Sequence, residues 1–411
     1  MKILHLSDIH MGSSFSHGKT DPATGRNSRL QDFTSALSGC IDAALEQEVD
    51  LVLFGGDAFP DSTPPPYVQE AFASQFNRLA QGQIPTVLLI GNHDQHSHGQ
   101  GGASLSIYRT LAGNSFIVGD QITTLKIETK SGPIQVTTLP WINRSGLLTR
   151  PETAGLSLSE INQLILKKLQ AILEQQIRSL DLEIPAILLA HAMVDRAVYG
   201  AEKFLAVSNR GFQIPLSFLA RSEYDYVALG HVHTHQNLKP DNNPPVVYAG
   251  SIERVDFSEE GEEKGYVLIE IAQDIKPKQL QWSFNPLATR PFKTIKVNVT
   301  ASPNPQAQII KAIKSSQINE AVVRLIYDIY PEQYDLIDVK AFDELLKEAH
   351  SYSIKANPAT NKSHQRLPEM GVGSHLTPLD ALKMYVESRQ GELKDIAQDM
   401  LEAAETLMAQ N

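Results

Sequence analysis

Asp8 and His10 have the residue types and the spacing that metal binding needs. They lie two residues apart at the end of a short apolar run, residues 2–7. An extended backbone directs side chains with this spacing to the same face. Because carboxylate and imidazole groups both coordinate divalent cations, the pair could share one ion.

Five further residues could bind a metal, and each ends or follows an apolar run. They are Asp57, Asn92, His191, His231 and His233, after the runs that begin at residues 50, 86, 186 and 226. With Asp8 and His10 they form a set of oxygen and imidazole ligands that suits Mn, Fe or Zn better than Ca. Seven ligands suit two metals with one bridging carboxylate. Taken singly, each residue is better explained as a turn, cap or buried polar residue.

Buried strands must hold these donors in place. The runs at residues 2–7 and 50–57 are typical of such strands. The apolar residues between them recur with the period of one helix face: Leu30, Phe33, Leu37, Ile41 and Leu45. These three segments predict a βαβ unit in an α/β fold. Since open α/β sheets bind ligands beyond the carboxyl ends of their strands, we expect five strand ends to converge on one site.

Other segments of the N-terminal half are predicted to be helical scaffold. They are residues 64–80, 104–112 and 158–180. The first carries an apolar stripe made of Tyr67, Ala71, Phe72, Phe76 and Leu79. We expect this stripe to pack in the core, and a dimer contact is the alternative interpretation.

Composition limits the possible functions. The chain has 411 residues, and 36 Lys and Arg against 47 Asp and Glu give a net charge of −11. This charge argues against a protein that binds nucleic acid only by neutralising its phosphates with Lys and Arg. The single cysteine, Cys40, excludes an intramolecular disulfide and a cysteine-cluster metal site. No apolar run approaches the ~18 residues of a membrane span, and the N-terminus does not resemble a secretory signal, so we expect a soluble, cytoplasmic protein.

The C-terminal half predicts a small α/β module followed by a tether and helices. Strand-like and helical segments alternate between residues 293 and 349. Residues 355–366 contain no acidic residue and are typical of a linker. Thr377, Pro378 and Asp380 then indicate a helix start. A last helix carries an apolar face made of Leu393, Ile396, Ala397, Met400, Leu401, Ala404, Leu407 and Met408. Either a partner or the chain's own small module must cover this face.

The donors in their order along the chain resemble one enzyme superfamily. The joint pattern is D-x-H, G-D, G-N-H-D, a later single His and G-H-x-H. It is similar to the pattern of calcineurin-like metallophosphoesterases. That resemblance implies a β-sandwich flanked by helices, with two metals at the strand ends. It implies that Asp8, His10, Asp57 and His233 hold one ion, while Asp57, Asn92, His191 and His231 hold the other.

Two residues of G-N-H-D are expected to act in catalysis rather than in metal binding. His93 would donate a proton to the departing ester oxygen or stabilise the transition state, and Asp94 would orient its imidazole. The alternative for His93 is a structural role beside the ligands. The reaction expected from this arrangement is hydrolysis of a phosphate ester.

Longer stretches resemble the SbcD family, the nuclease subunits of bacterial double-strand-break repair complexes. They are KILHLSDIHMG, GGDAF, VALGHVHTHQ and VVYAGSIERVDFSEEGEEKGYVLIEI. The resemblance implies a Mn²⁺-dependent 3′ to 5′ exonuclease on double-stranded DNA ends that also opens hairpins. It further implies a homodimer and an SbcC-type ATPase partner, bound by its coiled coil near the heads. A phosphoesterase of a small nucleotide and a non-catalytic scaffold for the ATPase are the alternatives.

The same resemblance gives the expected domain boundaries. Residues 1–285 would form the nuclease domain and residues 286–354 a cap domain that positions DNA. Residues 355–376 would be a linker, and residues 377–411 a helix pair that binds the ATPase.

Overall fold

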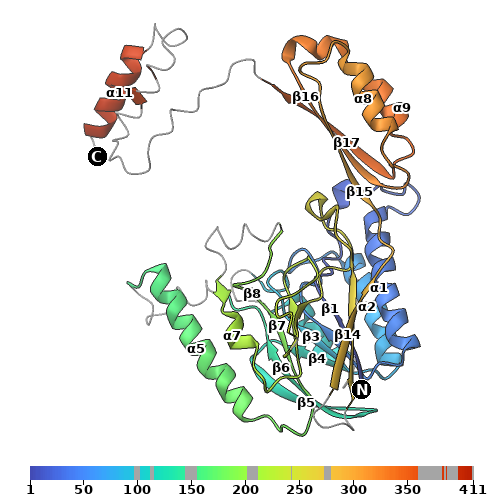
Figure 1. Cartoon of the computed structure of the whole chain (residues 1–411), viewed down its shortest axis with the longest axis vertical. Coiled ribbons are helices and arrows are strands. Elements are labelled where there is room, and N and C mark those ends of the chain that lie inside the picture. The colour runs from blue at the N-terminus through green and yellow to red at the C-terminus, as the bar shows by residue number, and fades with distance from the viewer. Residues whose placement is uncertain are drawn as a thin grey trace. The chain divides into compact units, whose positions relative to one another are not determined.

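The computed structural model describes residues 1–96, 102–111, 115–143, 155–200, 212–241, 243–272, 279–359, 382–383, 386 and 397–409. In this part of the chain, most strands belong to two six-stranded sheets (Figure 1). The first has the order β14-β13-β1-β2-β3-β4 and the second the order β11-β12-β10-β7-β6-β5. The predicted α/β fold is therefore confirmed, in the form of a β-sandwich flanked by helices.

The first sheet is parallel from β1 to β4, and β13 and β14 extend it with antiparallel pairing. Its strands are β1 (Lys2–Leu6), β2 (Leu51–Phe54), β3 (Thr86–Leu89), β4 (Phe116–Gly119), β13 (Gly265–Ala272) and β14 (Gln279–Pro286).

The second sheet has a parallel centre and antiparallel edges. Its strands are β5 (Thr123–Thr129), β6 (Gly132–Leu139), β7 (Ala186–His191), β10 (Tyr226–Gly230), β11 (Gln236–Asn237) and β12 (Val246–Tyr248). The short strands β8 (Met193–Val194) and β9 (Gln213–Ile214) pair with each other.

The two sheets share a buried core because alternate residues of their strands point to the same interior. Ile3, Leu53 and Val87 from the first sheet pack in one cluster with Ile187 and Tyr226 from the second. The residues between them, such as Leu4 and Phe54, face the opposite way and are also buried. Strands that are covered on both faces need continuous apolar runs, which is why the sequence shows runs rather than alternation.

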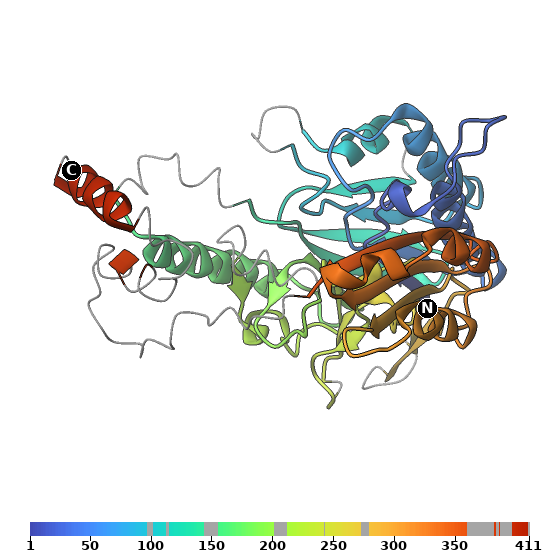
Figure 2. The same ribbon diagram turned by 90° about the horizontal axis from the view of Figure 1, so that it is seen from above.

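Helices cover the outer face of each sheet (Figures 1 and 2). On the first sheet these are α1 (Ser28–Glu46) and α2 (Pro66–Gln81), with the short η2 (Ser104–Ile107) and α3 (Tyr108–Leu111). On the second they are α5 (Leu158–Arg178) and α7 (Leu216–Leu219). The short η1 (Phe15–His17) lies beside Phe257, whose ring His17 contacts. The η4 turn (Phe257–Glu259) lies between β12 and β13. None of the helices among the described residues is long and apolar enough to cross a membrane.

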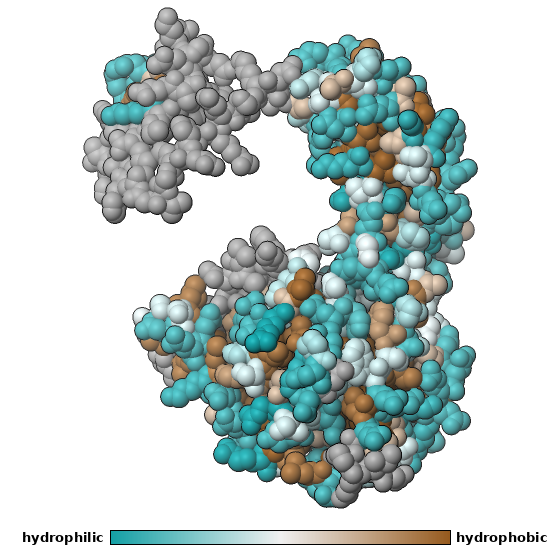
Figure 3. Space-filling view, viewed as in Figure 1, coloured by the Kyte–Doolittle hydropathy of each residue, from teal (hydrophilic) through white to brown (hydrophobic). Residues whose placement is uncertain are grey.

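The apolar stripe of α2 packs in the core, as the preferred interpretation predicts. Phe72, Phe76 and Leu79 are fully buried, and the rings of Phe72 and Phe76 stack with their centroids 4.4 Å apart. Tyr67 alone in the stripe remains 46% exposed. On the face shown in Figure 3, hydrophilic residues predominate and hydrophobic residues form small separate groups.

The predicted α/β module is present after β14. It consists of β15 (Phe292–Asn298), α8 (Pro305–Lys314), β16 (Val322–Ile329), η5 (Pro331–Leu336), α9 (Val339–Leu345) and β17 (Ser351–Pro358), with the sheet order β15-β16-β17. The chain divides into two compact units, residues 1–296, 312–325 and 340–354, and residues 297–311, 326–339 and 355–411.

The expected boundary between cap and linker needs a correction. Strand β17 runs through it, so residues 355–358 are strand and not linker. Lys355 is exposed between half-buried Ile354 and Ala356, but the polar composition of the stretch concealed that it continues the strand. Residues 360–376 lie outside the described residues.

Part of the predicted terminal helix pair is described. Helix α11 spans Ala397–Ala409, and residues 382–383 and 386 are also helical. In α11 the members of the predicted apolar face that are described, Ala397, Met400, Leu401 and Ala404, are half-buried, whereas the residues between them are exposed. Leu393 and Ile396, together with the side chains of Leu407 and Met408, lie outside the described residues.

Candidate metal centre

The donors lie at carboxyl ends of strands from both sheets, as the sequence predicts. Asp8 and His10 follow β1, Asp57 follows β2, and Asn92 follows β3 in the first sheet. In the second sheet His191 is the last residue of β7, and His231 and His233 follow β10. Five strand ends therefore bring seven side chains into one region. Six of them, together with His93, form three groups of closely spaced ligand atoms: Asp8, His10 and His233; His10, Asp57 and His93; and Asp57, His191 and His231.

The backbone of several donors adopts an unusual conformation. Asp8, His10, Asp57 and His231 have φ angles of 52°, 48°, 59° and 106°. Residues other than glycine rarely adopt positive φ, and strain of this kind concentrates at functional sites. Hydrogen bonds hold the loops in place, because the N–H groups of Asp8 and His10 donate to the carbonyls of Gly56 and Asp57 at 3.0 Å.

Gly91 explains why a glycine precedes Asn92. A Cβ atom on Gly91 would lie 2.2 Å from Oδ1 of Asp57 and 2.6 Å from its backbone nitrogen. The loops after β2 and β3 can approach each other this closely only without that side chain. The glycine thus brings Asn92 next to Asp57.

Asp8, His10 and His233 form the first group of possible ligands. The Nε2 atoms of His10 and His233 lie 3.0 Å apart, and Nε2 of His10 is 3.7 Å from Oδ2 of Asp57. Both oxygens of Asp8 accept a hydrogen bond from the N–H of His231 at 3.0 Å. Asp8 therefore also fixes the loop that carries two of the histidines.

Asp57, His191 and His231 form the second group. Nε2 of His191 is 3.3 Å from Oδ2 of Asp57. Oδ1 of Asn92 lies 3.0 Å from Nε2 of His191 and 2.9 Å from Nδ1 of His231. Asp57 is the carboxylate that reaches toward both groups, as a bridging ligand must.

The protonation of these groups favours cation binding. Burial, with the charge of His233, holds the pKa of His10 well below its usual range, and burial with the charge of His191 does the same for His231. Both imidazoles are therefore neutral and have a free lone pair. Burial opposes protonation of His191, but the charges of Asp57 and Asp8 outweigh it and raise its pKa to about 9. The buried carboxylates thus favour a positive charge at this point.

The donor set fits a pair of divalent ions. Nε2 of His10 and Nε2 of His233 lie 3.0 Å apart, close enough for their lone pairs to bind one cation together. In the second group, Nε2 of His231 is buried without a hydrogen-bond partner among the described residues. Hard oxygens and borderline imidazoles suit Mn, Fe or Zn.

His93 lies beside the donors but is anchored by a different residue than predicted. Its ring atom Nδ1 is 2.6 Å from the carbonyl oxygen of Pro60. Its backbone N–H donates to Oδ1 of Asp57 at 2.8 Å. Its ring meets that of His10 edge to face, with centroids 4.9 Å apart. When Nδ1–H donates to the carbonyl, Nε2 remains for proton transfer.

The prediction that Asp94 orients His93 was wrong. The Asp94 carboxylate accepts hydrogen bonds from the backbone N–H groups of Asp57, Ala58 and Gly91 at 2.8, 3.1 and 2.9 Å. Burial and the charge of Asp57 raise its pKa to about 6. Adjacency in G-N-H-D was misleading, because neighbouring residues in a turn point in different directions. Asp94 organises the loops after β2 and β3.

Two residues near the donors were missed by the sequence analysis. Glu259 Oε1 lies 2.7 Å from Nδ1 of His233. Trp141, just beyond β6, stacks on His231 with ring centroids 4.9 Å apart and an interplanar angle of 29°. Trp141 lies two residues after β6, so it follows a sixth strand end, and this position could have drawn attention to it. Glu259 was hidden among four neighbouring glutamates, which the sequence cannot rank.

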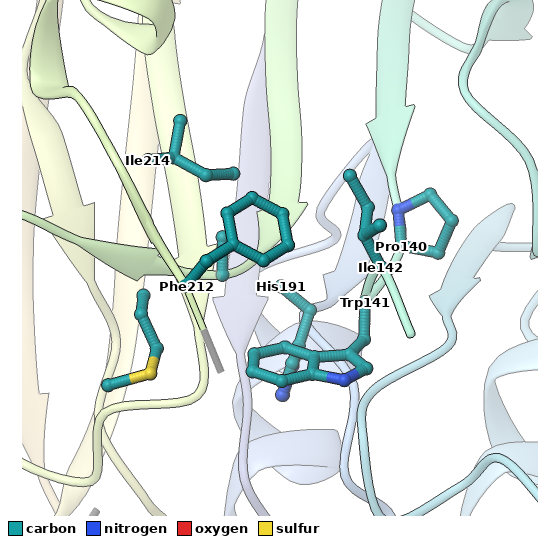
Figure 4. A pocket seen from close by; sticks show the side chains of 8 residues that line it. Pro140, Trp141, Ile142, His191, Phe212 and Ile214 are labelled. Atoms are coloured by element: carbon teal, nitrogen blue, oxygen red, sulfur yellow. The ribbon is translucent and has the colours of Figure 1, made fainter. Parts of the chain in front are cut away.

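Trp141 also forms one wall of a small apolar pocket beside the second group (Figure 4). Its lining includes His191, Met193, Phe212 and Ile214. Apolar side chains thus border His191, and they limit the access of water to this side of the donors.

Comparison with known proteins identifies similar chains. Residues 1–235 match the model of the family described as calcineurin-like phosphoesterase. Two similar curated relatives are both named as the D component of the nuclease SbcCD. The Escherichia coli K12 protein is 25% identical, with 96% of each chain covered. The Staphylococcus epidermidis protein is 24% identical, with 72% of each chain covered. Among solved structures, a dimetal phosphatase from Danio rerio is 14% identical with a TM-score of 0.42, covering 66% of this chain and 92% of its own.

Proposed function

Since the chain belongs to the calcineurin-like phosphoesterase family, we propose that it is a two-metal phosphodiesterase that cuts DNA. The observation that carries the proposal is the convergence of oxygen and imidazole donors around Asp57 from the ends of five strands. The relatives' name, which makes them part of the nuclease SbcCD, supports DNA as the substrate, and the Escherichia coli relative aligns over 96% of both chains.

We assign the donors to two ions. Asp8, His10, Asp57 and His233 would hold the first, and Asp57, Asn92, His191 and His231 the second. Mn²⁺ is the ion we expect to work best. Two such ions, when bound, activate a water for attack and stabilise the negative charge that gathers on the phosphoryl oxygens.

The chain's own residues supply the remaining chemistry. His93 holds a proton at Nε2 while the carbonyl of Pro60 fixes Nδ1, and it gives this proton to the departing ester oxygen. Asp94 keeps the N–H groups of Asp57 and Gly91 in place, so that the loops after β2 and β3 keep their shape. Trp141 shields the second group of donors from bulk water.

We propose the activities and partners that the resemblance implies. The protein would act as a 3′ to 5′ exonuclease on double-stranded ends and as an endonuclease on hairpins, in DNA repair and recombination in the cytoplasm. It would work as a homodimer with an SbcC-type ATPase, which residues 377–411 would bind. Residues 286–354 would act as the cap domain that positions DNA.

One side-by-side assay tests the substrate class. Purified protein with Mn²⁺ is offered linear duplex DNA labelled at either end, a DNA hairpin, and a small nucleotide diester. We expect nucleotides to be released from 3′ ends and the hairpin to be opened. Cleavage of the small diester alone would instead indicate a nucleotide phosphoesterase. No cleavage of any substrate by metal-loaded protein would indicate a scaffold for the ATPase.

A further inference from the structure

His233 is anchored by a charged group, whereas His191 is anchored by a neutral one. Nδ1 of His191 lies 2.6 Å from a neutral acceptor, the carbonyl oxygen of Gly55. Nδ1 of His233 instead lies 2.7 Å from Oε1 of Glu259, a carboxylate that is only 3% exposed. A buried carboxylate requires a reason, because removing it from water costs free energy unless it is paired.

Lys264 supplies that pairing and closes a ring of contacts. It is 1% exposed, and its Nζ lies 2.8 Å from Oε2 of Glu259. The same ammonium donates to the carbonyl oxygen of His233 at 3.2 Å and to Oε2 of Glu262 at 2.7 Å. The backbone N–H of Val255 donates to Oε2 of Glu259 at 3.0 Å. Both oxygens of Glu259 are therefore committed, and its carboxylate cannot rotate freely.

The position of Glu259 sets the tautomer of His233. Its Oε1, 2.7 Å from Nδ1, accepts a hydrogen bond from the Nδ1–H of the imidazole. It thereby leaves the lone pair on Nε2, the atom that lies 3.0 Å from Nε2 of His10.

From this geometry we infer that Glu259 and Lys264 are positioning residues for His233. Building on the proposed two-metal function, they hold His233 in the tautomer and orientation that bind the first ion. A carboxylate partner also makes the imidazole a stronger electron-pair donor to a metal. Loss of such a partner commonly lowers metal affinity by 10- to 100-fold. Nδ1 of His191 contacts a backbone carbonyl instead of a carboxylate. We therefore expect the affinity for only one of the two ions to depend on Glu259.

Mn²⁺ binding to metal-free protein tests this inference without relying on DNA cleavage. In Glu259→Gln we expect one ion to bind 10- to 100-fold more weakly and the other to bind as in the wild type. Raised Mn²⁺ should restore two ions per chain. Glu262→Gln is the matched control, since Glu262 contacts Lys264 and Thr234 but not the His233 ring, and it should leave both affinities unchanged.

Thermal unfolding of the metal-free variants in chelator shows whether Glu259 and Lys264 position His233 or are needed for folding. A second variant, Glu259→Gln with Lys264→Met, removes both buried charges together. It should stay folded and show the same selective loss of one ion. If wild-type protein binds no ion, the proposed function fails. If it binds two ions and Glu259→Gln binds both with unchanged affinity, only the present inference is overturned. Unfolding of both variants in chelator would also overturn it, because the pair would then serve folding instead.

Discussion

His93 is the residue on which the proposed proton transfer depends. In His93→Gln we expect hydrolysis of DNA to fall by ~10²- to 10⁴-fold, the usual value of a general acid, while metal content and fold stay unchanged. The matched control is His96→Gln, the same substitution three residues further on in a half-buried histidine outside the donor set. Single-turnover cleavage rates for the three proteins decide the matter. Turnover of His93→Gln within a few fold of wild type would show that His93 is only structural.

His5 should make stability depend on pH. It is fully buried, and burial with the charge of His235 lowers its pKa to about 3, against 6.5 in an unfolded chain. Between these values the unfolded state binds one more proton, so stability is complete above pH 6.5 and falls as the pH is lowered. The slope is about 1.4 kcal/mol for each pH unit. The free energy of unfolding, measured with denaturant between pH 5 and 6, should therefore depend less steeply on pH in His5→Asn than in wild type. An equal dependence on pH in the two proteins would exclude this role for His5.

Individual residues also show the limit of reasoning from sequence. The donors were predictable because each ends or follows an apolar run, and parallel strand ends meet at one edge. The anchors of His93 and His233 were not, because Pro60 contributes a backbone carbonyl that carries no sequence signal. Glu259 reaches His233 across 26 positions of sequence, a separation that only tertiary structure determines.

At the scale of elements, helix α2 is held to the first sheet by aromatic packing. Phe72 is fully buried and stacks on Phe76, whereas Tyr67 on the same helix is 46% exposed. We expect Phe72→Ala to cost ~3 to 5 kcal/mol, because it leaves a cavity. Tyr67→Ala, the matched control, should cost less than about 1 kcal/mol. Chemical denaturation measures both losses of stability, and equal losses would contradict the role given to Phe72 in holding α2 to the sheet.

The elements were predictable to different degrees. Helices α1 and α5 were clear because their apolar residues follow one helical face over five turns or more. The division of the strands between two sheets could not be derived from residues alone, since β3 and β7 are equally continuous apolar runs yet belong to different sheets. Only the family resemblance implied the sandwich. The end of β17, residues 355–358, was mistaken for the start of a linker because the stretch that begins there is polar and contains proline.

For the whole molecule, the terminal segment is proposed to separate assembly from catalysis. Polar replacement of Leu393, Ile396, Met400 and Leu407 should abolish association with the ATPase, because helix docking uses apolar anchors at this spacing. The isolated protein should keep its melting temperature and its metal. As the control, Gln398→Ser with Glu402→Ser changes exposed positions of α11 and should leave association intact.

A pull-down beside a melting curve distinguishes docking from packing on the chain's own module. A large fall in melting temperature with unchanged ATPase binding would show that the apolar face serves the chain's own fold.

The two-metal nuclease proposal is tested most directly by titrating Mn²⁺ into metal-free protein while bound ions and DNA cleavage are followed together. We predict two ions per chain and cleavage that rises only as the second ion binds. Asp57→Ala should bind neither ion tightly and cleave nothing, because its carboxylate lies between both groups of donors. Cleavage that persists in excess chelator, or two tightly bound ions in Asp57→Ala, would contradict the proposal.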